Sequence, residues 1–166
     1  AASLAHAPTA QKNRALLAVA SALAANEEKI LAANALDIEN AAANGVPKTM
    51  LDRLKLDHKR LEGIAASLGE LAALPDPVGE GERWVRPNGL TISRIRVPLG
   101  CIGIIYEARP NVTVDAAAIC VKTGNACVLR GGKEAINSNR ALVAAMKEAL
   151  ASCGLDPAAI ALIEIT

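Results

Sequence analysis

Charged and polar side chains follow two apolar segments of the sequence, each at the point where the segment ends. The segments are residues 101–105 and 126–129, and each reads as a buried strand followed by a loop and a helix. In an open α/β sheet, ligands bind outside the carboxyl ends of the strands, so we expect both loops to face a ligand. The residues concerned are Glu107, Arg109 and Asn111 in the first loop and Arg130, Gly131, Gly132 and Lys133 in the second.

The second loop has residue types that suit a phosphate group. Arg130 offers a rigid guanidinium fork and Lys133 a mobile point charge. Gly131 and Gly132 let the backbone approach a ligand closely, with its N–H groups toward phosphate oxygens. The spacing matches neither the G-x-G-x-x-G fingerprint nor a P-loop. From the residues alone, two interpretations stay open: a site for nucleotide phosphate or ribose, and a left-handed turn with solvated charges.

The first loop is shaped by Pro110. Proline fixes its own φ and disfavours helix at the preceding residue, so a helix is expected after it, over residues 112–123. Asn111 then lies near the helix N-terminus, where it either caps the helix or donates its amide N–H to an oxyanion. Asp115 is interpreted as a partner of the helix dipole rather than as a catalytic base. Tyr106 either stacks on a ligand or packs against the protein.

Two stretches carry a resemblance to a known family. Residues 97–135, VPLGCIGIIYEARPNVTVDAAAICVKTGNACVLRGGKEA, resemble the N-terminal signature of γ-glutamyl phosphate reductase, also called glutamate-5-semialdehyde dehydrogenase. Residues 50–68, MLDRLKLDHKRLEGIAASL, resemble the helical region of the same family. The likeness runs from about residue 10 to the end of the chain, but it covers only the first part of the family's length. The family belongs to the aldehyde dehydrogenase superfamily.

The resemblance implies an oxidoreductase of proline biosynthesis. Members reduce γ-glutamyl phosphate to glutamate 5-semialdehyde with NADPH in the cytoplasm. A cysteine thiolate displaces phosphate to give a thioester, which hydride from NADPH then reduces, so one difficult step becomes two easier ones. The nearest alternative is another thioester-forming relative, such as a CoA-acylating one. A different alternative is a non-catalytic binding or assembly module.

The resemblance also assigns roles to particular residues. The superfamily's ribose-binding lysine falls at Arg130, and the small and acidic residues after it fall near Gly132 to Glu134, so the cofactor set is Arg130, Gly131, Gly132, Lys133 and Glu134. The oxyanion asparagine falls in the loop of residues 107–111, which we call the EARPN loop after its sequence. We place it at Asn111, with Arg109 as a competitor for that place and a candidate for substrate binding. The nucleophilic cysteine lies beyond position 166, so this chain alone is expected to be inactive.

Composition narrows the classes of protein. The 166 residues suit one domain or one domain with an appendage, and 52 % are hydrophobic with no Phe, so the core must consist of Ala, Leu, Ile and Val. A net charge of +1 gives no long-range field for nucleic acid or anionic membranes. No membrane span or targeting leader is expected, which favours the cytoplasm.

The cysteines are expected to be structural. They form no C-x-x-C pair and only two His are present, so no metal site is expected. Their apolar neighbours predict four small buried residues in a reducing compartment. They are Cys101, Cys120, Cys127 and Cys153.

The remaining elements predict a helical layer and a hairpin. Residues 10–44 read as helix broken near Asn26, which is expected to cap the second half, and further helices are expected at 48–54 and 57–74. Asn88-Gly89 predicts a two-residue type I′ hairpin turn within residues 83–97, and the apolar phase shifts in a way that predicts a bulge near Ser93-Arg94. Four arginines on this hairpin suit either a solvated edge or an interface.

The C-terminal part predicts alternating strands and helices. Ser138 is expected to cap a helix, and residues 161–165 to start a third strand. The fold class is therefore α/β, with an N-terminal helical layer (1–82), a protruding hairpin (83–97) and the first half of a Rossmann-like domain (98–166). The resemblance implies that the hairpin serves homo-oligomer formation and that the Rossmann-like part is an aldehyde dehydrogenase-like cofactor domain. Because three short parallel strands cannot cover both faces of a sheet, we expect the chain to be a fragment. The resemblance implies that the catalytic domain is absent from it.

Overall fold

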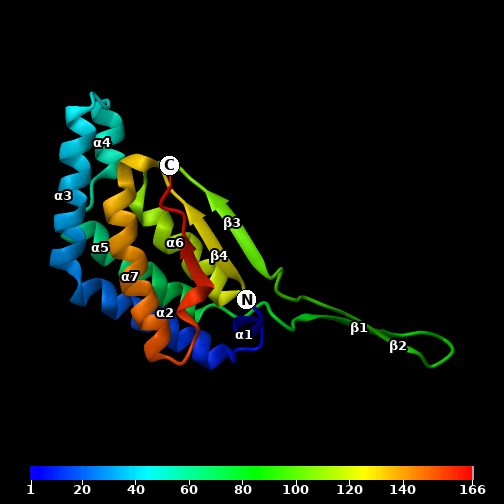
Figure 1. Cartoon of the computed structure of the whole chain (residues 1–166). Helices are drawn as coiled ribbons and strands as arrows, with labels where there is room; N and C mark the ends of the chain where they lie inside the picture. The colour runs from blue at the N-terminus through cyan, green and yellow to red at the C-terminus, as the bar shows by residue number, and fades with distance from the viewer. Residues whose placement is uncertain (166) are drawn as a thin grey trace.

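A helical layer, a two-stranded hairpin and a three-stranded sheet make up the computed structural model, which describes residues 1–165 (Figure 1). Thr166, the last residue of the expected cofactor domain, lies outside the described residues. The helical layer contains α1 (Ala2–Ala5), α2 (Thr9–Ala25), α3 (Glu27–Ala43), α4 (Lys48–Leu54) and α5 (His58–Ala73). The hairpin consists of β1 (Gly81–Val85) and β2 (Thr91–Ile95). The sheet part contains β3 (Cys101–Ile105), α6 (Pro110–Lys122), β4 (Ala126–Arg130), η1 (Lys133–Ala135), α7 (Ile136–Ser152), η2 (Pro157–Ala159) and β5 (Ile160–Leu162).

The sheet is parallel, with the strand order β3-β4-β5. The long helices all lie on one side of it (Figure 1). The central strand β4 is mostly buried, as predicted. The edge strand β3 is not the buried strand that its apolar run predicted, since Cys101 and Gly103 are exposed and Ile105 is 76 % exposed. An apolar run predicts a strand, but the position of that strand in the sheet depends on pairing with distant segments.

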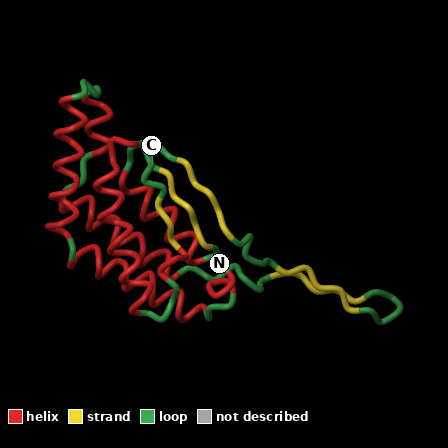
Figure 2. The backbone as a smooth tube through the Cα atoms, viewed as in Figure 1, coloured by secondary structure: helices red, strands yellow, loops and turns green. Residues whose placement is uncertain are grey.

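The hairpin projects from the body as a free ribbon (Figures 1 and 2). Its strands pair antiparallel in one continuous register from Gly81–Ile95 to Val85–Thr91, so the bulge expected near Ser93-Arg94 is not there. No bulge is needed because both faces of the ribbon are largely open to solvent, and a change of apolar phase then buries nothing on the wrong side.

The hairpin turn also differs from the prediction. Arg86 N donates to Leu90 O at 2.8 Å and Gly89 N donates to Arg86 O at 2.9 Å, which leaves a three-residue connection, Pro87 to Gly89. Gly89 has a φ of +85°, whereas Asn88 does not adopt a positive φ. The type I′ prediction is therefore wrong. Pro87 suits the first central position of an ordinary turn, and Gly89, two residues later, takes the left-handed position.

Aliphatic and alanine side chains form the core between the helices and the sheet, as composition predicted. The α2 helix contributes Leu16, Val19 and Leu23 to it, whereas Leu17 is 51 % exposed. Two of the four thiols are buried as expected, at Cys120 and Cys127, but Cys101 is exposed and Cys153 is only half-buried. No helix within residues 1–165 is both long and apolar enough to cross a membrane.

Two helix ends are closed differently from the predictions. The carboxylate of Asp37 on α3 accepts hydrogen bonds from Ser138 N at 2.7 Å and from Ser138 Oγ at 2.6 Å. Ser138 lies inside α7, so its predicted N-cap role is wrong, and a residue far away in the sequence satisfies the helix start instead. Asn26 donates its Nδ2 to Ala22 O at 2.9 Å and so closes α2 rather than capping α3.

Candidate functional site

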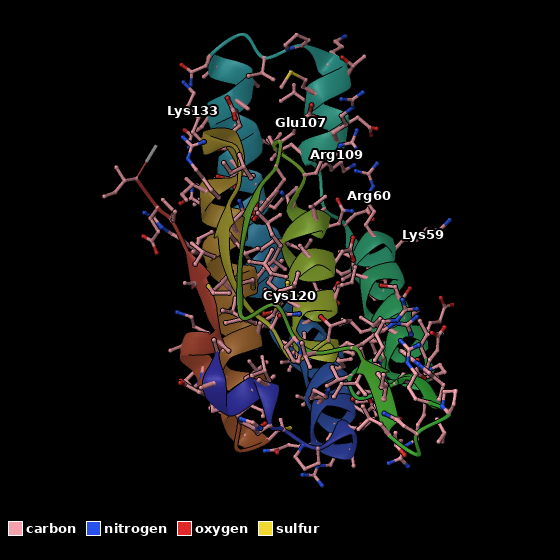
Figure 3. All side chains as sticks on the ribbon, turned by 90° about the vertical axis from the view of Figure 1, so that its right-hand side faces the viewer. Lys59, Arg60, Glu107, Arg109, Cys120 and Lys133 are labelled. Carbon is pink, nitrogen blue, oxygen red and sulfur yellow. The ribbon has the colours of Figure 1, made fainter. Side chains whose placement is uncertain are left out.

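The two loops predicted to face a ligand lie against each other at the carboxyl edge of the sheet. Tyr106 N donates to Arg130 O at 3.1 Å, which continues the pairing of β3 with β4 beyond the strand ends. A Cβ placed on Gly132 would lie only 3.0 Å from Ala108 N. Figure 3 shows Glu107, Arg109 and Lys133 at this one end of the molecule. The structure thus brings together the residues that the sequence placed on separate loops.

The Arg130–Glu134 turn carries cations without internal partners. Arg130 ends β4 and is exposed, and Lys133 begins η1 and is also exposed. Neither side chain is among the ion pairs or side-chain hydrogen bonds of residues 1–165. Glu134 is half-buried. Two unpaired cations on one turn suit an anionic ligand such as a phosphate.

The glycines of this turn serve the packing of the chain itself. Gly132 has a φ of −60° and Gly131 is not left-handed either, so the left-handed turn that stayed open from the sequence is excluded. A Cβ on Gly131 would overlap with Asn139 Nδ2, and one on Gly132 would lie 2.9 Å from Glu134 Oε2. Close approach to neighbouring groups, rather than a positive φ, therefore requires glycine at both positions.

A buried polar chain, which the sequence did not reveal, supports the same turn. Tyr106 Oη lies 2.8 Å from Thr113 Oγ1, and Thr113 Oγ1 donates to Asn139 Oδ1 at 2.7 Å. Burial raises the pKa of Tyr106, so its hydroxyl stays protonated, and the ring packs against the protein. Asn139 Nδ2, beside Gly131, is a buried donor without a partner in residues 1–165. An orphaned donor under the turn is consistent with a polar ligand nearby.

The EARPN loop begins α6. Arg109 is the N-cap residue and Pro110 the first helical residue, two positions earlier than predicted, because proline's fixed φ suits that place. Asn111 does not cap the helix. Its Nδ2 donates to Asp115 Oδ2 at 3.3 Å, one turn further on. Arg109 is half-exposed and lies 4.0 Å from Glu107, which Arg53 also approaches at 3.6 Å.

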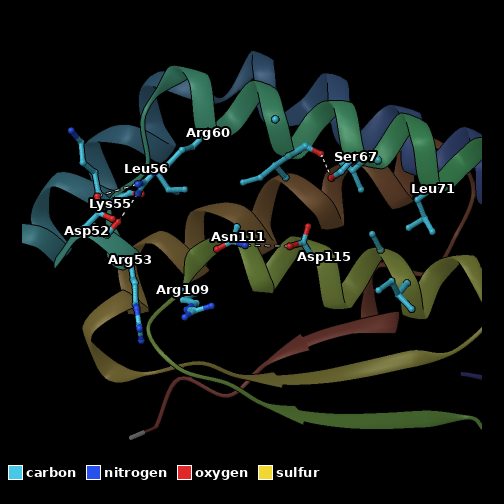
Figure 4. Close-up of a pocket in the computed structure, with 15 residues that line it drawn as sticks. Asp52, Arg53, Lys55, Leu56, Arg60, Ser67, Leu71, Arg109, Asn111 and Asp115 are labelled. Carbon is cyan, nitrogen blue, oxygen red and sulfur yellow. Dashed lines mark hydrogen bonds and ion pairs between the residues drawn. The ribbon is translucent and has the colours of Figure 1, made fainter. Parts of the chain in front are cut away.

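A groove of about 800 Å³ runs between α5 and α6 and reaches this loop (Figure 4). Its walls are mostly apolar, with Ile64, Leu68 and Leu71 from α5 and Ala118 and Ile119 from α6. Four basic side chains and two acidic ones also line it. They are Arg53, Lys55, Arg60 and Arg109, and Asp52 and Asp115.

Most charges of the groove are already engaged. Arg60 donates to Lys55 O at 2.6 Å and lies 3.1 Å from the carboxylate of Asp52. Two charges are not engaged. The Lys55 ammonium group makes no ion pair within residues 1–165, and Asp115 makes none either and accepts only the long hydrogen bond from Asn111. Burial raises the pKa of Asp115 above the ordinary value of 3.8. The sequence predicted a helix-dipole partner here, whereas the i,i+4 spacing of Asn111 and Asp115 was the available signal that both face one groove.

The described lining of the groove contains no cysteine. Elsewhere in the chain, Cys127 forms a hydrogen bond with Cys120. This bond, together with burial, raises the pKa of the Cys127 thiol far above the ordinary 9.0, so Cys127 is a poor nucleophile. Within residues 1–165, no group of three or more His, Cys, Asp or Glu side chains is arranged to hold a metal ion. The amide of Asn111 and the basic side chains of the lining are groups that can stabilise an anion beside the apolar walls of the groove.

Known proteins match nearly the whole chain, although no family model matches it. The gamma-glutamyl phosphate reductase of Heliobacterium modesticaldum is 59 % identical over 154 residues, which are 92 % of this chain and 37 % of that protein. The crystal structure of gamma-glutamyl phosphate reductase from Thermotoga maritima has a TM-score of 0.95 at 44 % identity, over 98 % of this chain and 40 % of its own.

A more distant structure shares the fold alone. An NAD-dependent aldehyde dehydrogenase from Sinorhizobium meliloti has a TM-score of 0.72 at 18 % identity, over 98 % of this chain and 30 % of its own. The chain spans about two fifths of the length of the reductases it matches. In sequence and in fold, it resembles the N-terminal part of the gamma-glutamyl phosphate reductases, within an aldehyde dehydrogenase-like architecture.

Proposed function

We propose that the protein containing this chain is a gamma-glutamyl phosphate reductase. It reduces γ-glutamyl phosphate to glutamate 5-semialdehyde with NADPH, for the biosynthesis of proline. The observation that carries the proposal is the 59 % identity to a reductase of that name over 92 % of the chain. The open groove beside the EARPN loop, with its amide and cations, has the polarity that an acyl phosphate requires.

The cofactor binds at the turn after β4. Arg130 and Lys133 contact the ribose and its 2′-phosphate, and Glu134 accepts from a ribose hydroxyl. Gly131 and Gly132 have no side chains that would stand between the backbone and the cofactor. The unpaired cations of Arg130 and Lys133, and the buried Asn139 Nδ2 without a partner beneath the turn, support this assignment. They also favour NADPH over NADH, which has no 2′-phosphate. NADPH, when bound, supplies the hydride that reduces the acyl group.

The substrate's acyl phosphate lies at the start of α6. Asn111 Nδ2 stabilises the negative charge that develops on the acyl oxygen, and Arg109 contacts the phosphate. A cysteine outside this chain is the nucleophile that displaces phosphate and forms the thioester. The high pKa of Cys127 and the cysteine-free lining of the groove support a nucleophile from elsewhere.

The proposal is tested with the full-length protein. Purified protein should oxidise glutamate 5-semialdehyde in the presence of phosphate and NADP⁺, with NADPH formation followed by its absorbance. The chain of 166 residues alone should show no turnover, because it lacks the nucleophile. Activity of the 166-residue chain would contradict the role given to the missing cysteine, and an inactive full-length protein would contradict the proposed function.

The hairpin is the proposed contact with a second copy of the protein. It projects from the body and leaves Val85, Leu90 and Ile95 more than half exposed. Replacing Ile92 and Ile95 together by Asp should lower the mass of the full-length protein measured by light scattering. An unchanged mass would show that the hairpin does not join the copies.

The free thiols support a reducing compartment such as the cytoplasm.

A further inference from the structure

Asp115 is the acidic residue of the groove lining that makes no ion pair within residues 1–165. The other acidic residue of the lining, Asp52, is paired with Arg60 at 3.1 Å. Asp115 is half-buried, makes no ion pair within residues 1–165, and receives one hydrogen bond of 3.3 Å. An ionised carboxylate in an apolar wall is unfavourable unless a cation or a strong donor meets it. The groove therefore has an unfilled requirement for a cationic group at Asp115.

The charges around Asp115 restrict what the ligand can be. Basic side chains outnumber acidic ones in the lining, and Lys55 makes no ion pair within residues 1–165, so the groove also suits an anionic group. The apolar walls of α5 and α6 beside Asp115 suit a short aliphatic chain. An anionic molecule with an aliphatic chain and one cationic group meets all three conditions. An α-amino acid that carries an activated side-chain carboxyl is such a molecule.

The spacing along α6 agrees with the length of such a substrate. Asn111 and Asp115 are four residues apart on one face of α6, and Asn111 Nδ2 lies 3.3 Å from Asp115 Oδ2. In a γ-glutamyl group, four bonds separate the acyl carbon from the α-nitrogen, or about 5 Å when extended. Figure 4 shows Asn111 and Asp115 side by side on α6. Because each hydrogen bond adds about 3 Å, an acyl oxygen that accepts from Asn111 leaves the ammonium group within reach of Asp115.

We propose that Asp115 binds the α-ammonium group of the substrate and so selects α-amino acid substrates over acyl compounds that lack the amino group. This inference rests on the proposed function, because it uses the acyl group at Asn111 as its reference point. Asn111 then has two tasks, since its amide both orients the carboxylate of Asp115 and faces the acyl oxygen.

The test compares two aldehydes in the full-length protein. Glutamate 5-semialdehyde carries the α-amino group, whereas 5-oxopentanoate has the same carbon chain and the same carboxylate but hydrogen in place of the amino group. Each is oxidised to its acyl phosphate while NADP⁺ is reduced and inorganic phosphate is taken up. The loss of a charge-assisted hydrogen bond in Asp115→Asn should raise KM for the amino-bearing aldehyde about ten- to a hundred-fold. KM for 5-oxopentanoate should change little.

Two further variants serve as controls. Asp115→Glu keeps the charge and should recover part of the preference for the amino-bearing aldehyde. Glu70→Gln removes a carboxylate from the exposed side of α5, outside the groove lining, and should leave both KM values unchanged. Circular dichroism of each variant checks that it is folded.

The outcomes separate the two proposals. Wild-type protein that oxidises neither aldehyde refutes the proposed function, and this inference falls with it. Wild-type activity with equal losses for both aldehydes in Asp115→Asn refutes the inference alone, because a structural role would affect both substrates. A selective loss with the amino-bearing aldehyde supports both.

Discussion

The two ends of α6 use charge in opposite ways. At the C-terminal end, Lys122 is 2 % exposed, yet all of its donors are engaged. Its Nζ donates to Asn13 Oδ1 at 2.7 Å, Ala72 O at 3.0 Å and Leu74 O at 2.7 Å. Lys12 and Asp76 form a second buried contact close by, at 2.6 Å. Burial lowers the pKa of Lys122, with the neighbouring charge of Asp76 opposing that shift.

At the N-terminal end the same helix leaves its polar groups open. Asp115 has one long hydrogen bond and no cation, and the turn next to this end carries Arg130 and Lys133 without partners. A polar group whose bonds are complete within the chain stabilises the fold, whereas an incomplete one costs stability unless a ligand completes it. Changes at the C-terminal end should therefore alter stability, and changes at the N-terminal end should alter ligand binding.

The largest effect is expected for Lys122→Met. Methionine keeps the apolar stem but leaves three oxygen acceptors without their donor, which should lower the free energy of unfolding by about 2–4 kcal/mol. Urea unfolding followed by circular dichroism measures the change. Lys29→Met, at an exposed position of α3, is the matched control and should stay near wild type. A Lys122→Met protein as stable as the control would remove the contrast between the two ends.

A comparable free energy should appear in cofactor binding for Arg130→Ala. The loss of a charge-assisted hydrogen bond worth about 1.5–3 kcal/mol should raise KM for NADPH about ten- to a hundred-fold. KM for NADH should rise much less, because NADH has no 2′-phosphate. Thermal stability should stay close to wild type, as it should in the control Arg86→Ala at the exposed hairpin tip. Equal losses with both cofactors would mean that Arg130 contacts something the two share.

The sequence predicted what local signals determine. α5 begins and ends within one residue of its predicted bounds, because Asp57 accepts from Arg60 N as a helix cap and apolar residues recur at helical spacing. The edge position of β3 and the capping of α7 by Asp37 escaped prediction, since both depend on contacts between residues far apart in the chain.

The candidate site divides in the same way. Both loops at the carboxyl edge could be placed from strand ends alone, and the structure brings them together. The groove between α5 and α6 could not, because it exists only once two helices from different parts of the chain pack side by side. The periodicity of apolar residues identifies which face of a helix is apolar. It does not identify which second helix packs beside that face, or whether a groove remains between the two helices.

A smaller effect of opposite sign is expected for the stability of Asp115→Asn. Burial raises the pKa of Asp115 above 3.8, so the carboxyl contributes stability below that pH and loses it as pH rises through the raised pKa. At neutral pH the ionised group costs stability, and asparagine removes that cost. The variant should therefore melt slightly above wild type at pH 7, and the difference should shrink in acid. A variant less stable than wild type at pH 7 would show that Asp115 supports the fold.

The smallest effect is expected at His58, which joins the start of α5 to α3 at the surface. Its Nδ1 lies 2.8 Å from Glu27 Oε1 and its Nε2 lies 3.3 Å from Glu62 Oε1. The hydrogen bond to Glu27 raises the pKa of His58 above 6.5, and the charges of both glutamates add to the shift.

Because this pKa is raised in the folded state, the contact contributes fully below pH 6.5 and is lost as pH rises through the raised value. The melting temperature of wild type should exceed that of His58→Ala by more at about pH 5.5 than at about pH 9. Added salt should reduce the difference, since the side chain is exposed and its ion pairs are screened. A difference that stays constant with pH would mean that His58 acts through packing, and that charge at this end of the molecule has no part in holding α3 to α5.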